Sequence, residues 1–185
     1  MITLYPRTTA LVLIDLQNAV LGRKLAPISA DELVARGKAL AAKFRAAGAP
    51  VVLVNVVPKL DGPVRQVDEP TRPPKTLPAG FADLAPGLAG PGDILITKST
   101  WGAFFMTDLD SELKNRGVST IVLGGVATHI GVEATARQAW ELGYELVIAR
   151  DVTTSLAVEP HEGTMRHIFP RIARVTHSNV LAFRG

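Results

Sequence analysis

The 185-residue sequence contains no cysteine, few aromatic residues (5%) and no long uninterrupted apolar run. The absence of cysteine excludes disulfides, thiolate metal ligands and thiol nucleophiles, and it is compatible with a reducing compartment. A membrane helix would need about 18 uninterrupted apolar residues, so we expect none. The first apolar run has no basic lead-in and no small-residue cleavage site, so we expect no secretion signal and a cytoplasmic protein.

Clusters of basic residues are also lacking. The chain has 20 Lys and Arg against 17 Asp and Glu, and the net charge of +3 is spread along it. Surfaces that follow nucleic-acid phosphates need gathered Lys and Arg, so we expect no nucleic-acid partner. Hydrophobic residues make up 47% of the chain, which is enough to offset the entropy of ordering it. The length is typical of one domain, so we expect a single domain over residues 1–185.

Short apolar runs alternate along the chain with segments of helical periodicity. The runs are rich in Val, Ile and Leu and show little apolar/polar alternation, as in strands buried on both faces. They cover residues 10–14, 51–57, 94–97, 120–126 and 144–149, with a short strand at 173–176. The helical segments cover residues 31–47, 107–116, 128–142 and 160–169. This order predicts an α/β three-layer sandwich, a parallel β-sheet flanked by helices on both faces.

One proline-rich segment, residues 58–91, is too long for an ordinary connection. Long loops in compact domains are often lids or binding segments, and a rigid surface loop is the equally weighted alternative. Its prolines are Pro58, Pro63, Pro70, Pro73, Pro74, Pro78, Pro86 and Pro91.

Two charged residues directly follow apolar runs. Asp15 follows the first run and Lys98 the third. The carboxyl ends of parallel strands meet at one edge of the sheet, where ligands bind. A partly buried Asp15 would have an altered affinity for its proton, which acid–base chemistry requires, although it could instead cap a turn or pair with a cation. Lys98 could hold Asp15 ionised, bind a substrate carboxylate or stabilise negative charge, or be a surface lysine.

A third candidate region is the strand-to-helix junction from Gly124 to Arg137. Thr128 is the expected N-cap, which would leave the amides of residues 130–132 free to attract an anion. Gly131 falls in the first turn, where glycine costs about 1 kcal/mol relative to alanine. It therefore indicates a need for space or close backbone approach, or else simple tolerance near a helix end.

Together these regions resemble the isochorismatase-like superfamily, which includes nicotinamidases, N-carbamoylsarcosine amidases and true isochorismatases. The resemblance covers nearly the whole chain and implies the family's Rossmann-like fold, with a cis peptide near Val126 and Ala127. Most members use an Asp, a Lys and a Cys; Asp15 and Lys98 match the first two, and Gly131 stands at the position of the cysteine. The matching blocks are LVLIDLQN, ITKSTWGAFFMTDLDSEL, GGVATHIGVEATARQAWELGY, ARDVTTS and HEGTMRHIFPRIARV.

The missing cysteine decides which chemistry the resemblance implies. Thioester chemistry of the amidase branch needs a thiolate, so it is excluded. Glycine also replaces the cysteine in the family's true isochorismatases, where the aspartate protonates a vinyl ether carbon, water adds and pyruvate leaves. The resemblance therefore implies that Asp15 is a general acid and that Lys98 positions it or binds a substrate carboxylate. Gly131 and its neighbours would supply amides and space.

The resemblance also implies the surroundings of the site. No cofactor or metal is expected, because the segment that carries the metal ligands of nicotinamidases has Asp61 and no histidine here. His161 and His167 are expected at a helix surface or a subunit contact. The partner is a small-molecule substrate, a carboxylate, and by analogy the chain forms a homodimer or homotetramer. The expected substrate contacts are Gln17, Trp101, Val126, Ala127, Thr128, His129 and Ile130.

Two other catalytic classes do not fit the sequence. A phosphatase of the haloacid dehalogenase type needs a second aspartate at the position of Gln17, so this class is excluded. A serine hydrolase is disfavoured because the sequence has no GxSxG motif. The open alternatives are a binding module that has lost its nucleophile, and hydrolysis of an unrelated substrate by water that Asp15 activates.

Overall fold

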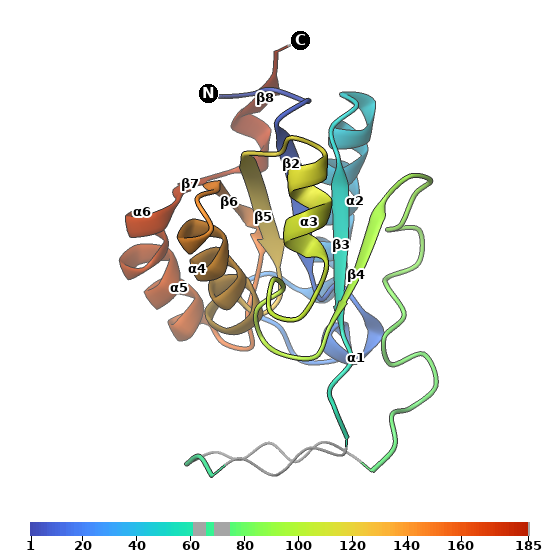
Figure 1. Cartoon of the computed structure of the whole chain (residues 1–185). Coiled ribbons are helices and arrows are strands. Elements are labelled where there is room, and N and C mark those ends of the chain that lie inside the picture. The colour runs from blue at the N-terminus through green and yellow to red at the C-terminus, as the bar shows by residue number, and fades with distance from the viewer. Residues whose placement is uncertain (61–65, 69–74, 185) are drawn as a thin grey trace.

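The computed structural model describes residues 1–60, 66–68 and 75–184 (Figure 1). The elements are β1 (Ile2–Leu4), β2 (Thr9–Ile14), α1 (Asn18–Leu21), α2 (Ala30–Ala46), β3 (Val51–Val56), β4 (Ile94–Lys98), α3 (Leu109–Asn115), β5 (Thr120–Gly125), the π-helical turn η1 (Thr128–Val132), α4 (Glu133–Glu141), β6 (Glu145–Thr153), α5 (Val158–His167), α6 (Phe169–Ile172), β7 (Arg174–Thr176), the 3₁₀ turn η2 (Ser178–Val180) and β8 (Leu181–Phe183).

The main sheet is parallel, with strand order β4-β3-β2-β5-β6-β7. From β2 the chain moves outward through β3 to β4, and it then returns to the other side of β2 to build β5, β6 and β7. The strand order therefore reverses between β2 and β5. In open parallel sheets, ligands bind at the carboxyl ends of the strands beside such a reversal.

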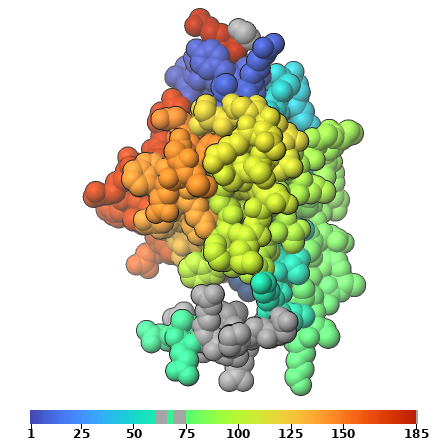
Figure 2. Space-filling view, viewed as in Figure 1, coloured from blue at the N-terminus to red at the C-terminus, as the bar shows by residue number. Residues whose placement is uncertain are grey.

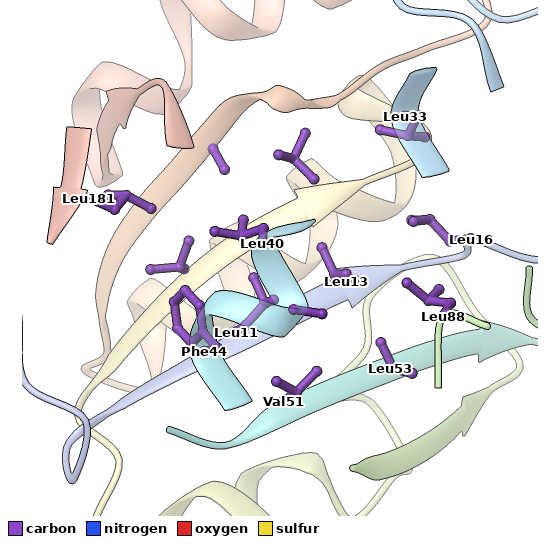
Figure 3. Packing of buried hydrophobic residues seen from close by; sticks show 14 of the residues in the cluster. Leu11, Leu13, Leu16, Leu33, Leu40, Phe44, Val51, Leu53, Leu88 and Leu181 are labelled. Atoms are coloured by element: carbon purple, nitrogen blue, oxygen red, sulfur yellow. The ribbon is translucent and has the colours of Figure 1, made fainter. Parts of the chain in front are cut away.

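Each central strand is buried on both faces because its alternate residues enter two separate cores. On one face, Leu11 and Leu13 of β2 pack with Leu40 and Phe44 of α2 (Figure 3). On the other face, the remaining β2 residues pack against α3, α4, α5 and α6, and Figure 1 shows these helices together on that side. The predicted three-layer α/β sandwich is confirmed.

Five of the six predicted strands agree with the observed strands to within one residue at each end. The sixth, β6, is longer than predicted and ends at Thr153. The helix expected over residues 128–142 is split: its first turn is π-helical and α4 begins only at Glu133. The two-stranded parallel sheet of β1 and β8 and the short helix α1 were not predicted. Three or four residues carry too little periodicity to be recognised, and the β1–β8 pairing joins opposite ends of the chain.

Gly125 lets β5 end in close contact with β2. Its φ is +121°, and a Cβ atom there would lie 2.1 Å from the carbonyl oxygen of Ile14. Only glycine fits such a conformation and such an approach. The close approach brings the turn after β5 against the residue that follows β2, which is Asp15.

Across the described ranges, no helix has the length and apolar character needed to cross a membrane. Several prolines of the 58–91 segment, among them Pro63, Pro70, Pro73 and Pro74, lie outside the described residues, as does Asp61.

Candidate active site

Asp15 and Lys98 meet at the carboxyl edge of the sheet, as the sequence predicts. Lys98 Nζ lies 2.8 Å from Asp15 Oδ2 and also donates to the carbonyl oxygen of Thr100 at 3.1 Å. The two side chains are only 8% and 2% exposed, respectively. The second carboxyl oxygen, Asp15 Oδ1, is buried and has no hydrogen-bond partner among the described residues. A buried oxygen without a partner can give a proton to, or take one from, a bound molecule.

Burial and Lys98 act on the pKa of Asp15 in opposite directions. Loss of solvation raises the pKa, and the charge and hydrogen bond of Lys98 lower it, so that it lies at about 6. The sequence alone left open which effect prevails, and burial does. Asp15 also has a φ of +56°, a left-handed conformation that is uncommon outside glycine and recurs at functional sites. The carboxyl group can therefore exchange its proton near neutral pH.

The turn after β5 differs in detail from the predicted anion site. The Val126–Ala127 peptide bond is cis, as the family resemblance implies. The amides of Ile130 and Val132 were expected to be free, but both donate to the carbonyl oxygen of Ala127, at 3.0 and 3.2 Å. The π-helical turn brings the Val132 amide back to this carbonyl, five residues earlier, so two of the three expected anion donors are already engaged.

Thr128 is not the N-cap that the sequence predicts. Ala127 precedes the turn, and no side chain caps it. The Thr128 hydroxyl donates instead to the carbonyl oxygen of Thr154 at 2.9 Å and lies 2.7 Å from His161 Nδ1. His161 is 1% exposed, so its expected place at a helix surface is wrong, whereas His167 is exposed. Thr128 and His161 connect the turn to β6 and α5.

Gly131 lies directly against the acid. A Cβ atom at this position would be 3.3 Å from Asp15 Oδ2, 3.2 Å from Ile14 Cγ2 and 3.4 Å from the carbonyl oxygen of Val126. Any side chain beyond hydrogen would therefore press on the Asp15–Lys98 pair. The role of Gly131 in leaving space for a substrate stays a prediction.

Gly131→Ala should lower stability modestly, because the new methyl group must displace its neighbours by a few tenths of an ångström. Overpacking costs about 1–3 kcal/mol, and the gain in helix propensity returns about 1 kcal/mol. The matched control is Gly163→Ala on α5, where a Cβ would meet nothing within 4 Å, so only the propensity gain remains. We expect thermal unfolding to show Tm lower by about 2–4 °C for Gly131→Ala and higher by a similar amount for Gly163→Ala. Equal shifts would contradict the close packing around Gly131.

The loop between β4 and α3 is fastened to α4. The amide of Ala103 donates to Thr135 Oγ1 at 3.1 Å, and the amide of Phe104 donates to Gln138 Oε1 at 3.1 Å. Figure 2 shows this loop and α3 beside α4 on one face of the molecule. Trp101 in this loop is 66% exposed, three residues after Lys98. Its contact with substrate stays a prediction.

The structure gives the Gln17 amide contacts that the sequence did not indicate. Gln17 is fully buried, and its Nε2 donates to the carbonyl oxygens of Val56 and Phe81 at 3.0 and 3.1 Å. Its Oε1 accepts from the amide of Val56 at 2.6 Å. Gln17 thus joins the ends of β2 and β3 to residues 81–85, and its contact with substrate stays a prediction.

Residues 81–85, inside the proline-rich segment, are hydrogen-bonded to residues at the carboxyl ends of β2 and β3. The amide of Asn18 donates to Asp83, and the amide of Ala85 donates to Leu16. This part of the segment is bound to the carboxyl edge of β2. Sequence reasoning missed it, because the contacts come from the side-chain amides of Gln17 and Asn55 and from main-chain groups distant in sequence.

Among the remaining predicted contacts, Val126 is buried, while Ala127, His129 and Ile130 are half-buried around the turn. His129 Nδ1 lies 2.7 Å from the hydroxyl of Ser155, at the end of β6. Within the described residues, no group of three or more His, Cys, Asp or Glu side chains is arranged to hold a metal ion.

A parallel sheet with a buried acid and ammonium beside its strand-order reversal has its charged groups where α/β proteins bind their ligands. The chain belongs to the isochorismatase family of hydrolases, whose isochorismatase domain matches residues 9–180. It is 49% identical over 179 residues to the uncharacterised isochorismatase family protein YecD of Escherichia coli O157:H7, covering 95% of each chain.

Two further comparisons agree with this assignment. The uncharacterised isochorismatase family protein YwoC of Bacillus subtilis is 42% identical over 171 residues, covering 90% of this chain and 88% of YwoC. The structure of an isochorismatase family protein from Burkholderia thailandensis superposes with a TM-score of 0.89 at 40% identity, over 96% of this chain and 94% of that one.

Proposed function

We propose that this hydrolase cleaves a vinyl ether, or a related small carboxylate substrate such as isochorismate, by general-acid catalysis from Asp15. The observation that carries the proposal is the Asp15 carboxyl group itself. One oxygen is held by Lys98, the other has no partner among the described residues, and the pKa lies at about 6. Hydrolysis of a vinyl ether needs a proton donor and water but no nucleophile from the protein, which suits a chain without cysteine.

The proposed reaction begins with transfer of the Asp15 proton from Oδ1 to the terminal carbon of the vinyl ether. The C=C electron pair takes the proton, and the adjacent carbon becomes an oxocarbenium ion. Water adds to that carbon and loses a proton, giving a hemiketal that separates into pyruvate and an alcohol. Asp15 regains a proton from water. Lys98 holds Oδ2 throughout, so it orients the acid and stabilises the carboxylate left after proton transfer.

Gly131 contributes space to this reaction. Glycine has no side chain, so no Cβ atom lies 3.3 Å from Asp15 Oδ2, where any larger residue would place one. Gly131→Cys tests whether this is the position of the family's thiol. Amidase activity in that variant would show that the pocket still accommodates thiol chemistry.

The direct experiment incubates the protein with isochorismate and measures pyruvate with a coupled lactate dehydrogenase assay. Catalytic release that depends on Asp15 supports the proposal. Tight binding without pyruvate formation would overturn it in favour of a binding module. A binding module would keep Asp15 and Lys98 together as a structural ion pair, so the assay must distinguish binding from turnover.

The pH dependence of kcat/KM separates acid catalysis from the second candidate function, activation of water by Asp15. A general acid must be protonated, so kcat/KM should be flat below about pH 6 and fall about tenfold per pH unit above it. A general base must be ionised, so the same group would make the rate rise through pH 6 and level off above it. A profile rising with pH on isochorismate would contradict the acid role, and the same rise on a different ester or amide would support water activation.

A further inference from the structure

Two histidines adjoin the π-helical turn, and each is bonded to a buried hydroxyl group. His129 Nδ1 lies 2.7 Å from Ser155 Oγ, and His161 Nδ1 lies 2.7 Å from Thr128 Oγ1. Both hydroxyl residues are 0% exposed. A hydroxyl has one proton to donate, so its other neighbours decide which nitrogen of each ring is protonated.

The Ser155 hydroxyl proton has one acceptor within reach among the described residues, which is His129 Nδ1. The backbone N–H and C=O of Ser155 are already paired with Ala26. Buried hydroxyl groups keep their proton in a hydrogen bond, so Ser155 donates to Nδ1. Nδ1 then carries no proton, and the proton of the neutral His129 ring lies on Nε2.

His161 has the opposite arrangement and provides an internal reference. Thr128 Oγ1 donates its proton to the carbonyl oxygen of Thr154, so it can only accept from His161. The proton of His161 therefore lies on Nδ1. The histidine of the turn and the histidine of α5 thus have different tautomers, because one hydroxyl has a carbonyl to donate to and the other does not.

The Nε2–H group of His129 faces away from the buried hydroxyl. Nδ1 and Nε2 lie on different sides of the imidazole ring, and the ring is half-buried whereas Ser155 is fully buried. His129 also lies between the cis peptide and Gly131, on the turn that touches Asp15. Burial lowers the pKa of His129 more than the neighbouring Glu133 raises it, so the ring is neutral at pH 7.

We infer that Ser155 is a positioning residue that fixes His129 as an Nε2–H donor, and that this donor binds a carboxylate or carbonyl oxygen of the substrate. A neutral donor at this place favours ligands with an oxygen acceptor and rejects those that present N–H groups there. The identity of the substrate rests on the proposed function. The tautomer does not, because it follows from contacts inside the protein.

The first test is NMR of the full chain with ¹⁵N-labelled histidine at pH 7, in which His129→Gln assigns the His129 signals. We expect an unprotonated Nδ1 and a protonated Nε2 for His129, and the reverse for His161. Ser155→Ala should give His129 a mixture of tautomers without changing His161. A protonated Nδ1 on His129 in the wild type would overturn the inference.

Pyruvate serves as the carboxylate probe in the same spectra. Its addition should shift the His129 Nε2–H resonance and leave the His161 signals in place. A titration that leaves the Nε2–H resonance unmoved would overturn the ligand-binding role.

Kinetics with isochorismate provide a second readout through two matched variants. In His129→Gln the amide N–H group stands near the place of Nε2, and in His129→Asn it stands near Nδ1. The loss of a hydrogen bond to a charged acceptor should raise KM about tenfold or more for Asn, with a smaller rise for Gln and little change in kcat. Equal rises would overturn the inference. If the wild type releases no pyruvate, the proposed function fails, while the NMR measurement still decides the tautomer.

Discussion

Asp15→Asn is expected to lower kcat for vinyl ether cleavage by about 10²- to 10⁴-fold, because the amide cannot supply the proton that starts the reaction. The substitution keeps the size of the side chain and an oxygen that can accept from Lys98 Nζ, which lies 2.8 Å from Asp15 Oδ2. KM should change little, since binding of the substrate does not need the acidic proton. Initial rates of pyruvate release over a range of isochorismate concentrations measure both constants.

Two controls show whether the lower kcat of Asp15→Asn comes from the missing acidic proton or from a folding defect. The circular dichroism spectrum of Asp15→Asn should match that of the wild type. Asp110→Asn removes a carboxylate of an exposed ion pair with Lys114 on α3, and should leave kcat unchanged. An Asp15→Asn variant that retains more than about a tenth of the wild-type kcat would contradict general-acid catalysis.

Lys98→Met is expected to have the largest effect on stability. Removal of one partner of a buried ion pair leaves an uncompensated charge and costs about 3–5 kcal/mol. Lys98 and Asp15 are both buried, so water cannot replace the lost contact. Urea denaturation at pH 8 measures the change in free energy of unfolding. Lys114→Met on the exposed pair with Asp110 is the matched control and should cost less than about 1 kcal/mol.

The stability that Lys98→Met loses should depend on pH, and its direction follows from the sign of the Asp15 pKa shift. The pKa is raised in the folded protein from 3.8 to about 6, so folding favours the protonated acid. Its stability contribution is complete below about pH 3.8 and decreases as the pH rises through 6. Lys98 lowers this pKa, so Lys98→Met raises it further and extends the decrease to higher pH. The variant should therefore be closer to wild-type stability at pH 4 than at pH 8.

The same variant also tests the acid role of Asp15. A higher pKa keeps the carboxyl group protonated at higher pH, so the decline of kcat/KM should begin above pH 6 in Lys98→Met. A decline that stays at the wild-type pH would show that a group other than Asp15 controls the profile. A penalty that is the same at pH 4 and pH 8 would contradict the linkage between the pair and folding.

The layers of the fold and the meeting of the two charges follow from local patterns in the sequence. The apolar runs at β2, β3, β5 and β6 are buried on both faces, which requires a parallel sheet covered by helices. The run at β4 was expected to be buried in the same way, but β4 is an edge strand and its Leu95 is 64% exposed. Parallel strands place their carboxyl ends at one edge, so the residues directly after β2 and at the end of β4 lie on the same edge. The strand order places only β3 between them, and the Lys98 side chain reaches Asp15. Gly131 was recognisable because glycine is costly in a helix without a steric reason.

Other features depended on partners distant in sequence. The side chain of Gln17 binds main-chain groups 39 and 64 residues away, and Thr128 binds Thr154 and His161 in place of a helix amide. The π-helical form of the first turn engaged amides that a regular helix start would have left free. No local pattern contains these partners.

The sequence by itself therefore determined that the central strands are buried, at which edge the polar residues gather, and that the chain supplies no thiol. Only the tertiary structure decided that burial outweighs Lys98 in setting the pKa of Asp15, and which hydroxyl fixes each histidine. The reason is physical: apolar periodicity is repeated along the chain, whereas solvation and hydrogen-bond direction exist only when distant segments meet.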